Sequence, residues 1–275
     1  MEGVTSQRRG TELLAHAARS DELDLTIFMP CRDEEGNVAR SLDEVVETLK
    51  HYEFTYEIIV VDDASKDGSV AEIDRFMKDH PGVNIQLKKN PQPLGVSYNL
   101  NDAAMLGRGR YFQFLSSSFQ NRRESLQTTF NELGSADIVI TSMTPDLRAW
   151  HRRRLSRLYT RLVNAVSGYD MPHYHGTPIF RRIDVVRWHS YRTVGFYADM
   201  ITCLLDEGVS YVVVPTPCHE REKGKSHALR IGNVISLLVG FADMLLRRFS
   251  KDRILPTRLP SRRERAQGCP GKLDF

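Results

Sequence analysis

Residues 61–69 of the chain read Val61-Asp62-Asp63-Ala64-Ser65-Lys66-Asp67-Gly68-Ser69, and they continue the apolar run that begins at Glu57. The β-branched residues of that run predict a buried strand. The acids, serines and glycine after it predict a loop that leads into a helix. A second apolar run, Leu25 to Met29, ends in the loop Pro30-Cys31-Arg32-Asp33-Glu34-Glu35. Both predicted strands therefore end in closely spaced carboxylates.

Strand and helix signals alternate around these loops. Apolar residues at helical spacing predict helices over 37–50 and after Ser69, and a long amphipathic helix over 231–246. Further strands are predicted at 83–87, 111–115 and 138–140. This alternation favours a mostly parallel sheet covered on both faces. Ligands of such sheets bind beyond the carboxyl ends of the strands, so the loops after these strands are where we expect the site.

Composition and short motifs exclude several classes of protein. The 275 residues, 41% of them hydrophobic, suffice for one sizeable core. No GxGxxG follows the first strand and no P-loop is present, so dinucleotide-binding and NTPase functions lose their main support. The cysteines lack CxxC spacing and predict neither disulfides nor a zinc site. Without a signal peptide or a spanning run, we expect a cytoplasmic protein. The four cysteines are Cys31, Cys203, Cys218 and Cys269.

Positive charge is concentrated in two stretches, although the net charge is only +3. Residues 148–154 carry four arginines and no acid, and residues 247–275 carry nine Lys/Arg against three Asp/Glu. Such stretches suggest a phosphate-bearing partner: a nucleotide diphosphate, a lipid phosphate or a membrane surface. A solvated tail is the alternative for residues 247–275. No motif supports nucleic-acid binding.

Together the two loops resemble those of the family-2 glycosyltransferases, which are written Pro-x-x-Asn-Glu and Val-Asp-Asp-Gly-Ser-x-Asp-Gly-Ser. Asp33 replaces the Asn here and Ala64 replaces the first Gly. The resemblance continues at Asn90, Gly95, Asn101 and Gly109. The resemblance implies an α/β GT-A fold: a Rossmann-like three-layer sandwich with a mostly parallel central sheet and a helical C-terminal extension. It also implies that a UDP- or GDP-type nucleotide-sugar is bound by Pro30, Arg32, Glu34, Asp62, Asp63, Ser65, Gly95 and Asn101. For either loop alone, helix capping is the alternative.

The fourth strand end resembles, and then departs from, the polyprenyl-phosphate sugar synthases. In those enzymes the segment after the fourth strand is similar to Leu-Asp-Ala-Asp-Leu-Gln-His-Pro-Pro-Glu, and its two aspartates bind a divalent cation. This chain reads Leu115-Ser116-Ser117-Ser118-Phe119-Gln120-Asn121-Arg122-Arg123-Glu124. Gln120 keeps its place in this degenerate motif, but serines replace both acids, and serines are poor ligands for Mg²⁺ or Mn²⁺. We expect no tightly bound metal and at most weak Mg²⁺ or Mn²⁺ binding through the diphosphate.

Arginines replace both prolines of the motif. Arg122 and Arg123 are positioned to grip phosphate oxygens and stabilise a leaving group without metal. The alternative is that they open an exposed helix and face water.

The C-terminal third adds acceptor candidates by resemblance. The branch carries Arg-x-x-Gly-x-Ser-Lys, and here Arg221, Lys225 and Ser226 match or neighbour that motif. Ser156 and Asn164 lie in a predicted helix similar to the branch's acceptor helix. An arginine of the branch is replaced by Met143, and Arg148 and residues 152–154 are candidates to compensate.

Two further sites are suggested by single residues. Asp199 falls where the wider family places its catalytic base, although capping or pairing with an arginine is the alternative. His173 and His175 are spaced for metal binding, but two histidines without a third clear ligand are more often structural.

We divide the chain into a lead-in at 1–22, a GT-A glycosyltransferase-like domain at 23–228, an amphipathic helix at 229–250 and a basic tail at 251–275. The predicted function is inverting transfer of a sugar from a nucleotide-sugar to a polyprenyl-phosphate or small-molecule acceptor. The amphipathic helix and the tail fit peripheral docking on a membrane. The alternative is a repurposed or non-catalytic protein that keeps the nucleotide pocket.

Overall fold

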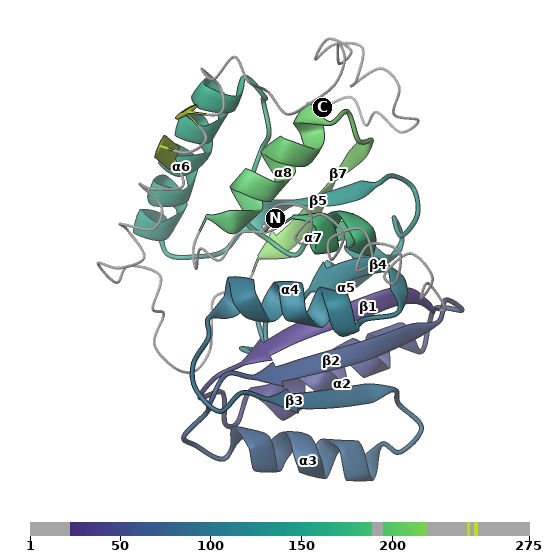
Figure 1. Ribbon diagram of the computed structural model, residues 1–275. Helices are drawn as coiled ribbons and strands as arrows, with labels where there is room; N and C mark the ends of the chain where they lie inside the picture. The colour runs from purple at the N-terminus through teal and green to yellow at the C-terminus, as the bar shows by residue number, and fades with distance from the viewer. Residues whose placement is uncertain (1–22, 189–194, 219–240, 243–244, 247–275) are drawn as a thin grey trace, which may run out of the picture. The chain divides into compact units, whose positions relative to one another are not determined.

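The computed structural model describes residues 23–188, 195–218, 241–242 and 245–246 (Figure 1). Seven strands form a sheet in the order β3-β2-β1-β4-β6-β5-β7. The pairs β1–β2, β1–β4, β2–β3 and β5–β7 are parallel. The predicted α/β fold with a mostly parallel sheet is therefore confirmed. The chain divides into two compact units, Met1–Phe119 with Phe180–Ser190, and Gln120–Ile179 with Tyr191–Phe275.

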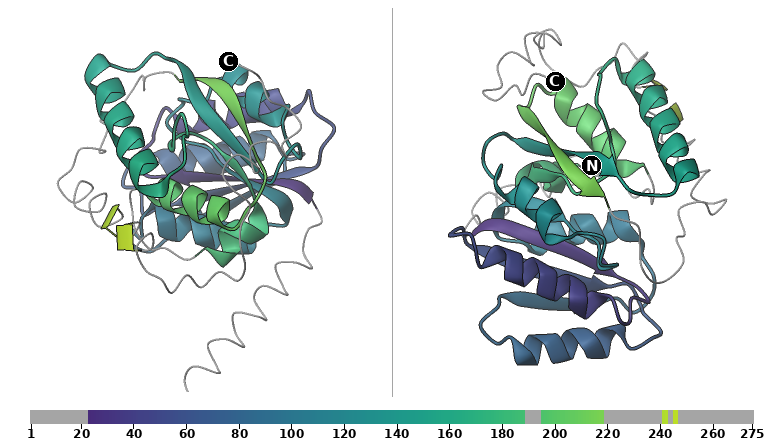
Figure 2. Two further views of the ribbon diagram at one scale, coloured as in Figure 1. Left: turned by 90° about the horizontal axis from the view of Figure 1, so that it is seen from above. Right: turned by 180° about the vertical axis from the view of Figure 1, so that it is seen from behind.

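The first unit is built on four parallel strands whose apolar runs form its core. In β1 and β2 the core side chains Leu25, Ile27, Ile58 and Ile59 are fully buried. Helices α4 and α7 pack on one face of the strands and α2 lies on the other (Figures 1 and 2). The strands are β1 (Leu23–Cys31), β2 (Tyr56–Asp62), β3 (Ile85–Lys89) and β4 (Gly109–Phe114), and the helices are α2 (Val38–Leu49), α3 (Ser69–Asp79), α4 (Val96–Leu106) and α7 (Arg182–Arg187). The short β6 (Ile179–Arg181) leads directly into α7.

Among its described residues, the second unit contains two long parallel strands and three helices. Ile138 of β5 pairs with Tyr211 of β7, and α5 packs against β7. Most of α8 is buried, whereas α6 buries only Thr160, Val163 and Ser167. The elements are α5 (Arg123–Phe130), β5 (Ile138–Asp146), α6 (Trp150–Ser167), α8 (Phe196–Asp206) and β7 (Tyr211–Cys218). Within the described part of the chain, no helix combines the length and apolarity that crossing a bilayer requires.

The first residue of β4 lies so close to β1 that only glycine fits there. A Cβ on Gly109 would lie 2.3 Å from the Thr26 nitrogen and 2.5 Å from the Leu25 carbonyl carbon, both backbone atoms. We predict that Gly109→Ala lowers the free energy of unfolding by about 2–3 kcal/mol, because β4 must move away from β1. Urea unfolding measures the change.

Gly82→Ala is the matched control, since a Cβ on Gly82 meets nothing within 4 Å. It should leave stability unchanged or raise it by up to about 1 kcal/mol. Equal effects of the two substitutions would contradict the close approach of β4 to β1.

Candidate functional site

The loops after β1 and β2 are joined by reciprocal hydrogen bonds. The Asp33 amide donates to Ser65 Oγ at 3.0 Å, and the Lys66 amide donates to Asp33 Oδ1 at 2.8 Å. Asp33 and Ala64 both have left-handed backbones, with φ of 54° and 60°. These are the positions where the resembled family has Asn and Gly, the residues that adopt this conformation most readily. Ser65, predicted to bind the nucleotide, therefore has a hydroxyl that joins the loops.

A second set of bonds continues this junction toward α3. The Glu35 amide donates to Asp67 Oδ2 at 3.0 Å, and the Gly68 amide donates to Glu35 Oε2 at 3.0 Å. The Glu34 amide donates to Ser69 Oγ at 2.8 Å. Glu34 is 8% exposed and its Oε2 accepts the Asn37 side-chain amide at 3.1 Å. Asp33, Glu35 and Asp67 thus hold the two loops together, and neither α2 nor α3 has a side-chain hydrogen bond from its N-cap residue.

The Asp63 carboxylate anchors the turn before α4. Its Oδ1 accepts the Asn90 side-chain amide at 2.9 Å and the Leu94 amide at 2.8 Å, and its Oδ2 accepts the Gly95 amide at 3.0 Å. Burial alone would raise the pKa of Asp63, but hydrogen bonds from Leu94, Asn99, Asn90 and Gly95 outweigh it and lower the pKa. Gly95 has φ of 90°, which favours glycine. Asp63 and Gly95 therefore fix the turn that leads into α4.

Asp62 differs from its neighbour because one of its oxygens has no partner. Asp62 is 4% exposed; its Oδ2 accepts the Ser65 amide at 3.3 Å, and its Oδ1 is buried without any hydrogen bond. A buried, unsatisfied carboxylate oxygen costs stability unless a donor reaches it. It lies at the carboxyl end of β2, where parallel sheets bind ligands. Asp62 is the member of the predicted nucleotide set best prepared to accept a hydrogen bond from a ligand.

Three other members of the predicted nucleotide set have different surroundings. Arg32 is exposed in the loop after β1. The Pro30 carbonyl accepts the Ser117 hydroxyl at 2.7 Å. Asn101 faces α7: with its amide oriented to donate, its nitrogen lies 3.3 Å from the Val185 carbonyl and 3.0 Å from the Trp188 carbonyl. We therefore assign Asn101 to packing of α4 on α7.

The serine loop after β4 is closed by its own hydroxyls. Ser116 Oγ and Ser118 Oγ lie 2.6 Å apart and share a hydrogen bond. Ser41 on α2 donates from its hydroxyl to the Ser117 carbonyl at 3.0 Å and accepts the Phe119 amide at 2.8 Å. Two hydroxyls satisfy each other at this distance, whereas two carboxylates would repel unless a cation or proton bridged them. The loop is ordered by contacts that need no ion.

The divalent cation that the resemblance implies does not fit the residues at this position. Ser116 and Ser118 offer neutral oxygens that are already hydrogen-bonded to each other, and Mg²⁺ and Mn²⁺ favour carboxylates. Among residues 23–188, 195–218 and the four described residues beyond them, no cluster of three or more His, Cys, Asp or Glu could hold a metal. His173 and His175 accordingly do not form part of such a cluster.

Gln120, Arg122 and Arg123 follow the serine loop in the chain and begin the second unit. Gln120 and Arg122 are half-exposed and Arg123 is exposed. Arg122 is the N-cap residue of α5 but makes no side-chain capping bond. Cations at a helix N-terminus oppose the helix dipole, so α5 gains nothing from them as a helix.

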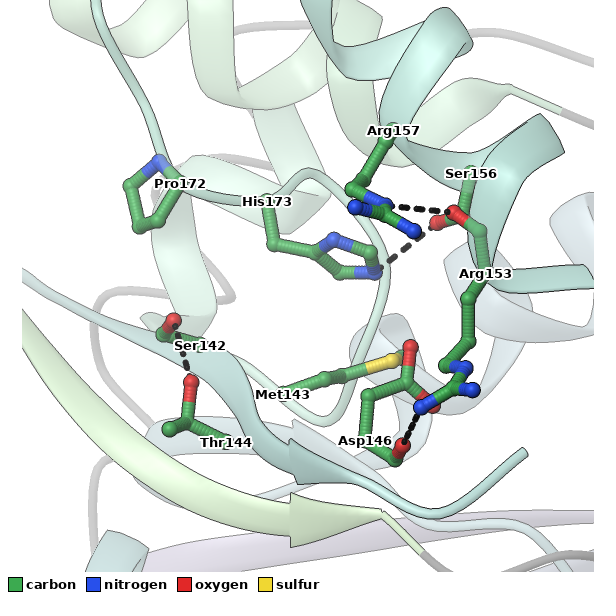
Figure 3. A pocket seen from close by; sticks show the side chains of 9 residues that line it. All are labelled: Ser142, Met143, Thr144, Asp146, Arg153, Ser156, Arg157, Pro172 and His173. Atoms are coloured by element: carbon green, nitrogen blue, oxygen red, sulfur yellow. Dashed lines mark hydrogen bonds between the residues drawn. The ribbon is translucent and has the colours of Figure 1, made fainter. Parts of the chain in front are cut away.

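A cavity of about 420 Å³ lies between β5, α6 and the loop before β6 in the second unit (Figure 3). Two guanidinium groups and a hydroxyl reach it from α6, and His173 faces them from the loop. Ser156 Oγ and His173 Nε2 lie 3.4 Å apart. The cavity is lined by Ser142, Met143, Thr144, Asp146, Arg153, Ser156, Arg157, Pro172 and His173. Two arginines beside hydroxyls form an environment suited to a phosphate.

Arg148, which follows β5 closely in the chain, is not among the residues that line this cavity. Arg148 donates to both carboxylate oxygens of Asp146, at 2.8 and 2.7 Å, and its side chain is 12% exposed. Burial would raise the pKa of Asp146, but the bonds from Arg148 lower it. Arg148 is therefore bound by Asp146. Arg153, another candidate to compensate for the arginine replaced by Met143, lines the cavity together with Arg157. Sequence reasoning missed Arg157, although it follows Arg153 by one helical turn.

His173 is buried and His175 is half-buried, and both are neutral imidazoles at physiological pH. Burial lowers the pKa of His173 to about 3, with further lowering by His175 and Arg148. Burial and Arg148 lower the pKa of His175 to about 4. His175 stacks on the Tyr159 ring with centroids 4.9 Å apart. A neutral His173 can accept the Ser156 hydroxyl proton and fix the orientation of that hydroxyl.

Asp199 and Asn164 are the remaining sequence-predicted site residues that the structure describes. Asp199 is half-buried in the first turn of α8. Its charge contributes to the raised pKa of Tyr159, after burial and Tyr174. Asn164 supports the loop above α6: its amide donates to the Met171 carbonyl at 2.9 Å and its oxygen accepts the Tyr174 hydroxyl at 2.8 Å. Arg221, Lys225 and Ser226 lie outside the described residues, as does most of the predicted helix at 229–250.

The family model described as glycosyl transferase family 2 matches residues 26–188, more than half of the chain. A dolichyl-phosphate beta-glucosyltransferase of Dictyostelium discoideum is 29% identical over 33% of this chain and 29% of its own length. An undecaprenyl-phosphate 4-deoxy-4-formamido-L-arabinose transferase of Edwardsiella ictaluri is 27% identical over 54% of this chain and 46% of its own. The chain thus spans less than half the length of these curated relatives.

A solved structure shares the fold. A mannosyltransferase from Pyrobaculum calidifontis, in complex with GDP-mannose and Mn²⁺, superposes with a TM-score of 0.58. It is 23% identical and covers 88% of this chain and 73% of its own. At this identity the likeness supports the fold.

The buried histidines predict a loss of stability in mild acid. Because their folded pKa values lie below the unfolded value of about 6.5, protonation favours the unfolded chain. Their contribution is complete above pH 6.5 and is lost as the pH falls toward 4. We expect unfolding free energy to drop between pH 6 and 4.5 by about 1.4 kcal/mol per pH unit for each histidine. His173→Gln/His175→Gln should flatten this slope in urea titrations, whereas replacement of exposed His51 should not.

The serine loop predicts that a metal site can be restored. Ser116→Asp/Ser118→Asp places two carboxylates where the hydroxyls lie 2.6 Å apart, so the pair gains by binding a cation. We expect the variant to bind Mn²⁺ at least about tenfold more tightly than the wild type, as measured by calorimetry. Ser116→Asn/Ser118→Asn has similar volume without charge and should bind no better than the wild type. Equal Mn²⁺ affinity of the two variants would contradict the assignment.

Proposed function

The chain belongs to glycosyl transferase family 2, and on this premise we propose that it transfers a sugar from a nucleotide-sugar to a polyprenyl phosphate. The observation that carries the proposal is the buried, unpartnered Oδ1 of Asp62 at the carboxyl end of β2. A hydrogen-bond acceptor at this position needs a hydrogen-bond donor, and the N–H groups of a nucleotide base supply one. The relatives named above are transferases that act on polyprenyl phosphates, which supports the acceptor.

On the donor side, Asp62 receives the base, and the neighbouring loops are rigid enough to orient it. Asp63 and Gly95 hold the adjacent turn before α4 through the bonds described above. Arg32 and Glu34 stand in the loop after β1, where ribose and phosphate contacts are expected by resemblance. The hydrogen bond between Asp62 and the edge of the base selects the nucleotide, whose base is uracil or guanine.

On the acceptor side, we assign the cavity of the second unit to the phosphate of the polyprenyl chain. Its volume of about 420 Å³ exceeds that of a phosphate group and leaves room for the first part of the lipid. Arg153 and Arg157 neutralise the phosphate, and the Ser156 hydroxyl, oriented by His173, lies at the edge of the same cavity. The carboxylate of Asp146 does not repel the phosphate strongly because Arg148 is bound to both of its oxygens.

The reaction is a direct displacement with inversion. An oxygen of the acceptor phosphate forms a bond to the anomeric carbon as the bond from that carbon to the diphosphate oxygen breaks. The electron pair of the broken bond leaves with the nucleoside diphosphate. A phosphate oxygen is already ionised at neutral pH, so no base is needed; Asp199 becomes necessary only if the acceptor is a hydroxyl.

The leaving diphosphate requires compensation for its developing charge. We infer that guanidinium groups supply it, with Arg122 and Arg123 as the candidates that follow the serine loop, and with Arg221, Lys225 and Ser226 as candidates outside the described residues. Guanidinium groups bind phosphate oxygens bidentately and keep their charge at all physiological pH values. Any Mg²⁺ or Mn²⁺ would then bind weakly, through the diphosphate.

A small-molecule acceptor is the remaining alternative within the same chemistry, and the arginines beside the cavity favour an anionic one. A repurposed or non-catalytic protein is not favoured, because the relatives named above are sugar transferases. The basic cavity on α6 is also difficult to explain in a protein that binds only a nucleotide.

The test is nucleotide-sugar binding and turnover with Asp62→Asn. We predict that the substitution weakens binding of a UDP- or GDP-sugar by about 10- to 100-fold, because a charge-assisted hydrogen bond is lost. Calorimetry measures binding, and transfer of radiolabelled sugar to a polyprenyl phosphate, with and without EDTA, measures turnover.

Asp43→Asn, at an exposed position on α2, is the matched control and should bind normally. Thermal unfolding of both variants separates a binding defect from a folding defect. Absence of binding to any nucleotide-sugar by the wild type would overturn the proposed function. Turnover that EDTA abolishes would overturn its metal-independent form.

A further inference from the structure

Helix α6 exposes a second side-chain face that the core does not use. Thr160, Val163 and Ser167 point into the second unit. Away from them, Leu155, Leu158 and Leu162 are 51%, 54% and 46% exposed, and Trp150 is 61% exposed. The α6 outer face, as we name it, consists of Trp150, Arg154, Leu155, Arg157, Leu158, Arg161 and Leu162.

Helical spacing sorts these residues into two adjacent stripes. Arg154, Arg157 and Arg161 follow one another at three or four residues and form a basic stripe, and the three leucines form an apolar stripe beside it. α6 carries five arginines and neither Asp nor Glu. A helix that needed only solubility would balance its charges and would not present leucines to water.

The basic stripe encloses a shallow basin. It has a volume of about 350 Å³ and is lined by Arg154, Arg157, Leu158 and Arg161. Above it, the Arg154 guanidinium lies over the Trp150 ring, 4.9 Å from the ring centroid, a contact that holds the indole at the surface. The basin combines positive charge with an apolar floor, which suits a phosphate that is attached to hydrocarbon.

We propose that the α6 outer face docks this protein on an anionic lipid bilayer. Lipid headgroup phosphates occupy the basic stripe, and Trp150 and the leucines lie at the boundary between headgroups and acyl chains. Charge complementarity selects this occupant: a second copy of the chain would place arginines against arginines across a two-fold axis. The proposal rests on the proposed function in one respect, since Arg157 lines both the basin and the acceptor cavity, which brings the cavity to the surface where polyprenyl phosphate resides.

The test uses the full-length protein and vesicles without donor or acceptor. In a Trp188→Phe variant, Trp150 is the remaining tryptophan of the chain's two. We expect its emission to shift to shorter wavelength, and to be quenched by brominated acyl chains, on vesicles of phosphatidylcholine with phosphatidylglycerol. Pure phosphatidylcholine vesicles and high salt should abolish the change. Co-sedimentation of the unmodified protein with the same vesicles provides a second readout.

Variants test whether vesicle binding depends on the two stripes of α6 or on nonspecific adsorption of exposed apolar side chains. Arg154→Gln/Arg161→Gln should weaken vesicle binding about 25-fold, at about fivefold for each arginine. Leu155→Ser/Leu158→Ser should retain salt-dependent association and lose the blue shift. The matched control is Met105→Ser/Leu106→Ser on α4, where the side chains are 43% and 42% exposed, and it should bind as the wild type does.

Three results would overturn the proposal: vesicle binding that the leucine and arginine variants leave unchanged, Trp150 emission that does not respond in bound protein, or Trp150 already shielded from acrylamide without vesicles. The last would mean that residues 229–250 or another copy cover the face. Vesicle binding without sugar transfer would count against the proposed function alone, and transfer without vesicle binding against the docking surface alone.

Discussion

The carboxylate of Asp63 holds together three segments that are distant in sequence. By accepting hydrogen bonds from Asn90, Leu94 and Gly95, it ties the end of β2 to the chain after β3 and to the start of α4. Burying a charge is unfavourable, and these donors offset the cost only if all remain in place. This arrangement leaves Asp62 as the acid with an oxygen to spare. In the proposed function the adjacent aspartates have separate roles: Asp63 stabilises the turn, and Asp62 accepts a hydrogen bond from the ligand.

The serine loop shows how such a site changes without losing its shape. Two acids at positions 116 and 118 would require a cation to lie close together, whereas two serines satisfy each other and keep the same turn. Ser41 and Ser117 fix the loop to α2 and β1 by bonds that are independent of the charge. The substitution therefore alters the chemistry of the strand end more than its geometry. In the proposed function, arginines then bind the diphosphate in place of a cation.

The sequence predicted the fold and the family, both of which are confirmed, because apolar runs and turn residues report local structure directly. It did not predict which polar groups are consumed internally. Asn101 turns toward α7, Arg148 is bound to Asp146, and Arg182 is fully buried with hydrogen bonds to the Gly109 and Ala104 carbonyls. Each choice depends on which partner tertiary packing brings near. Likewise, the leucines of α6 marked a helix correctly, but helical spacing alone does not say which apolar stripe faces the core.

Helix α6 contributes to the core, to the cavity and to the exposed surface of the second unit. One of its faces packs through Val163, another lines the cavity through Ser156, and a third presents leucines and arginines to the outside. A lipid phosphate with a long hydrocarbon chain must keep that chain in the bilayer while its phosphate group reaches a polar site. A single rigid helix that is basic on two neighbouring faces meets both requirements, because the same Arg157 borders the cavity and the outer basin. In the function and docking surface proposed above, Arg157 therefore connects lipid contact with acceptor binding.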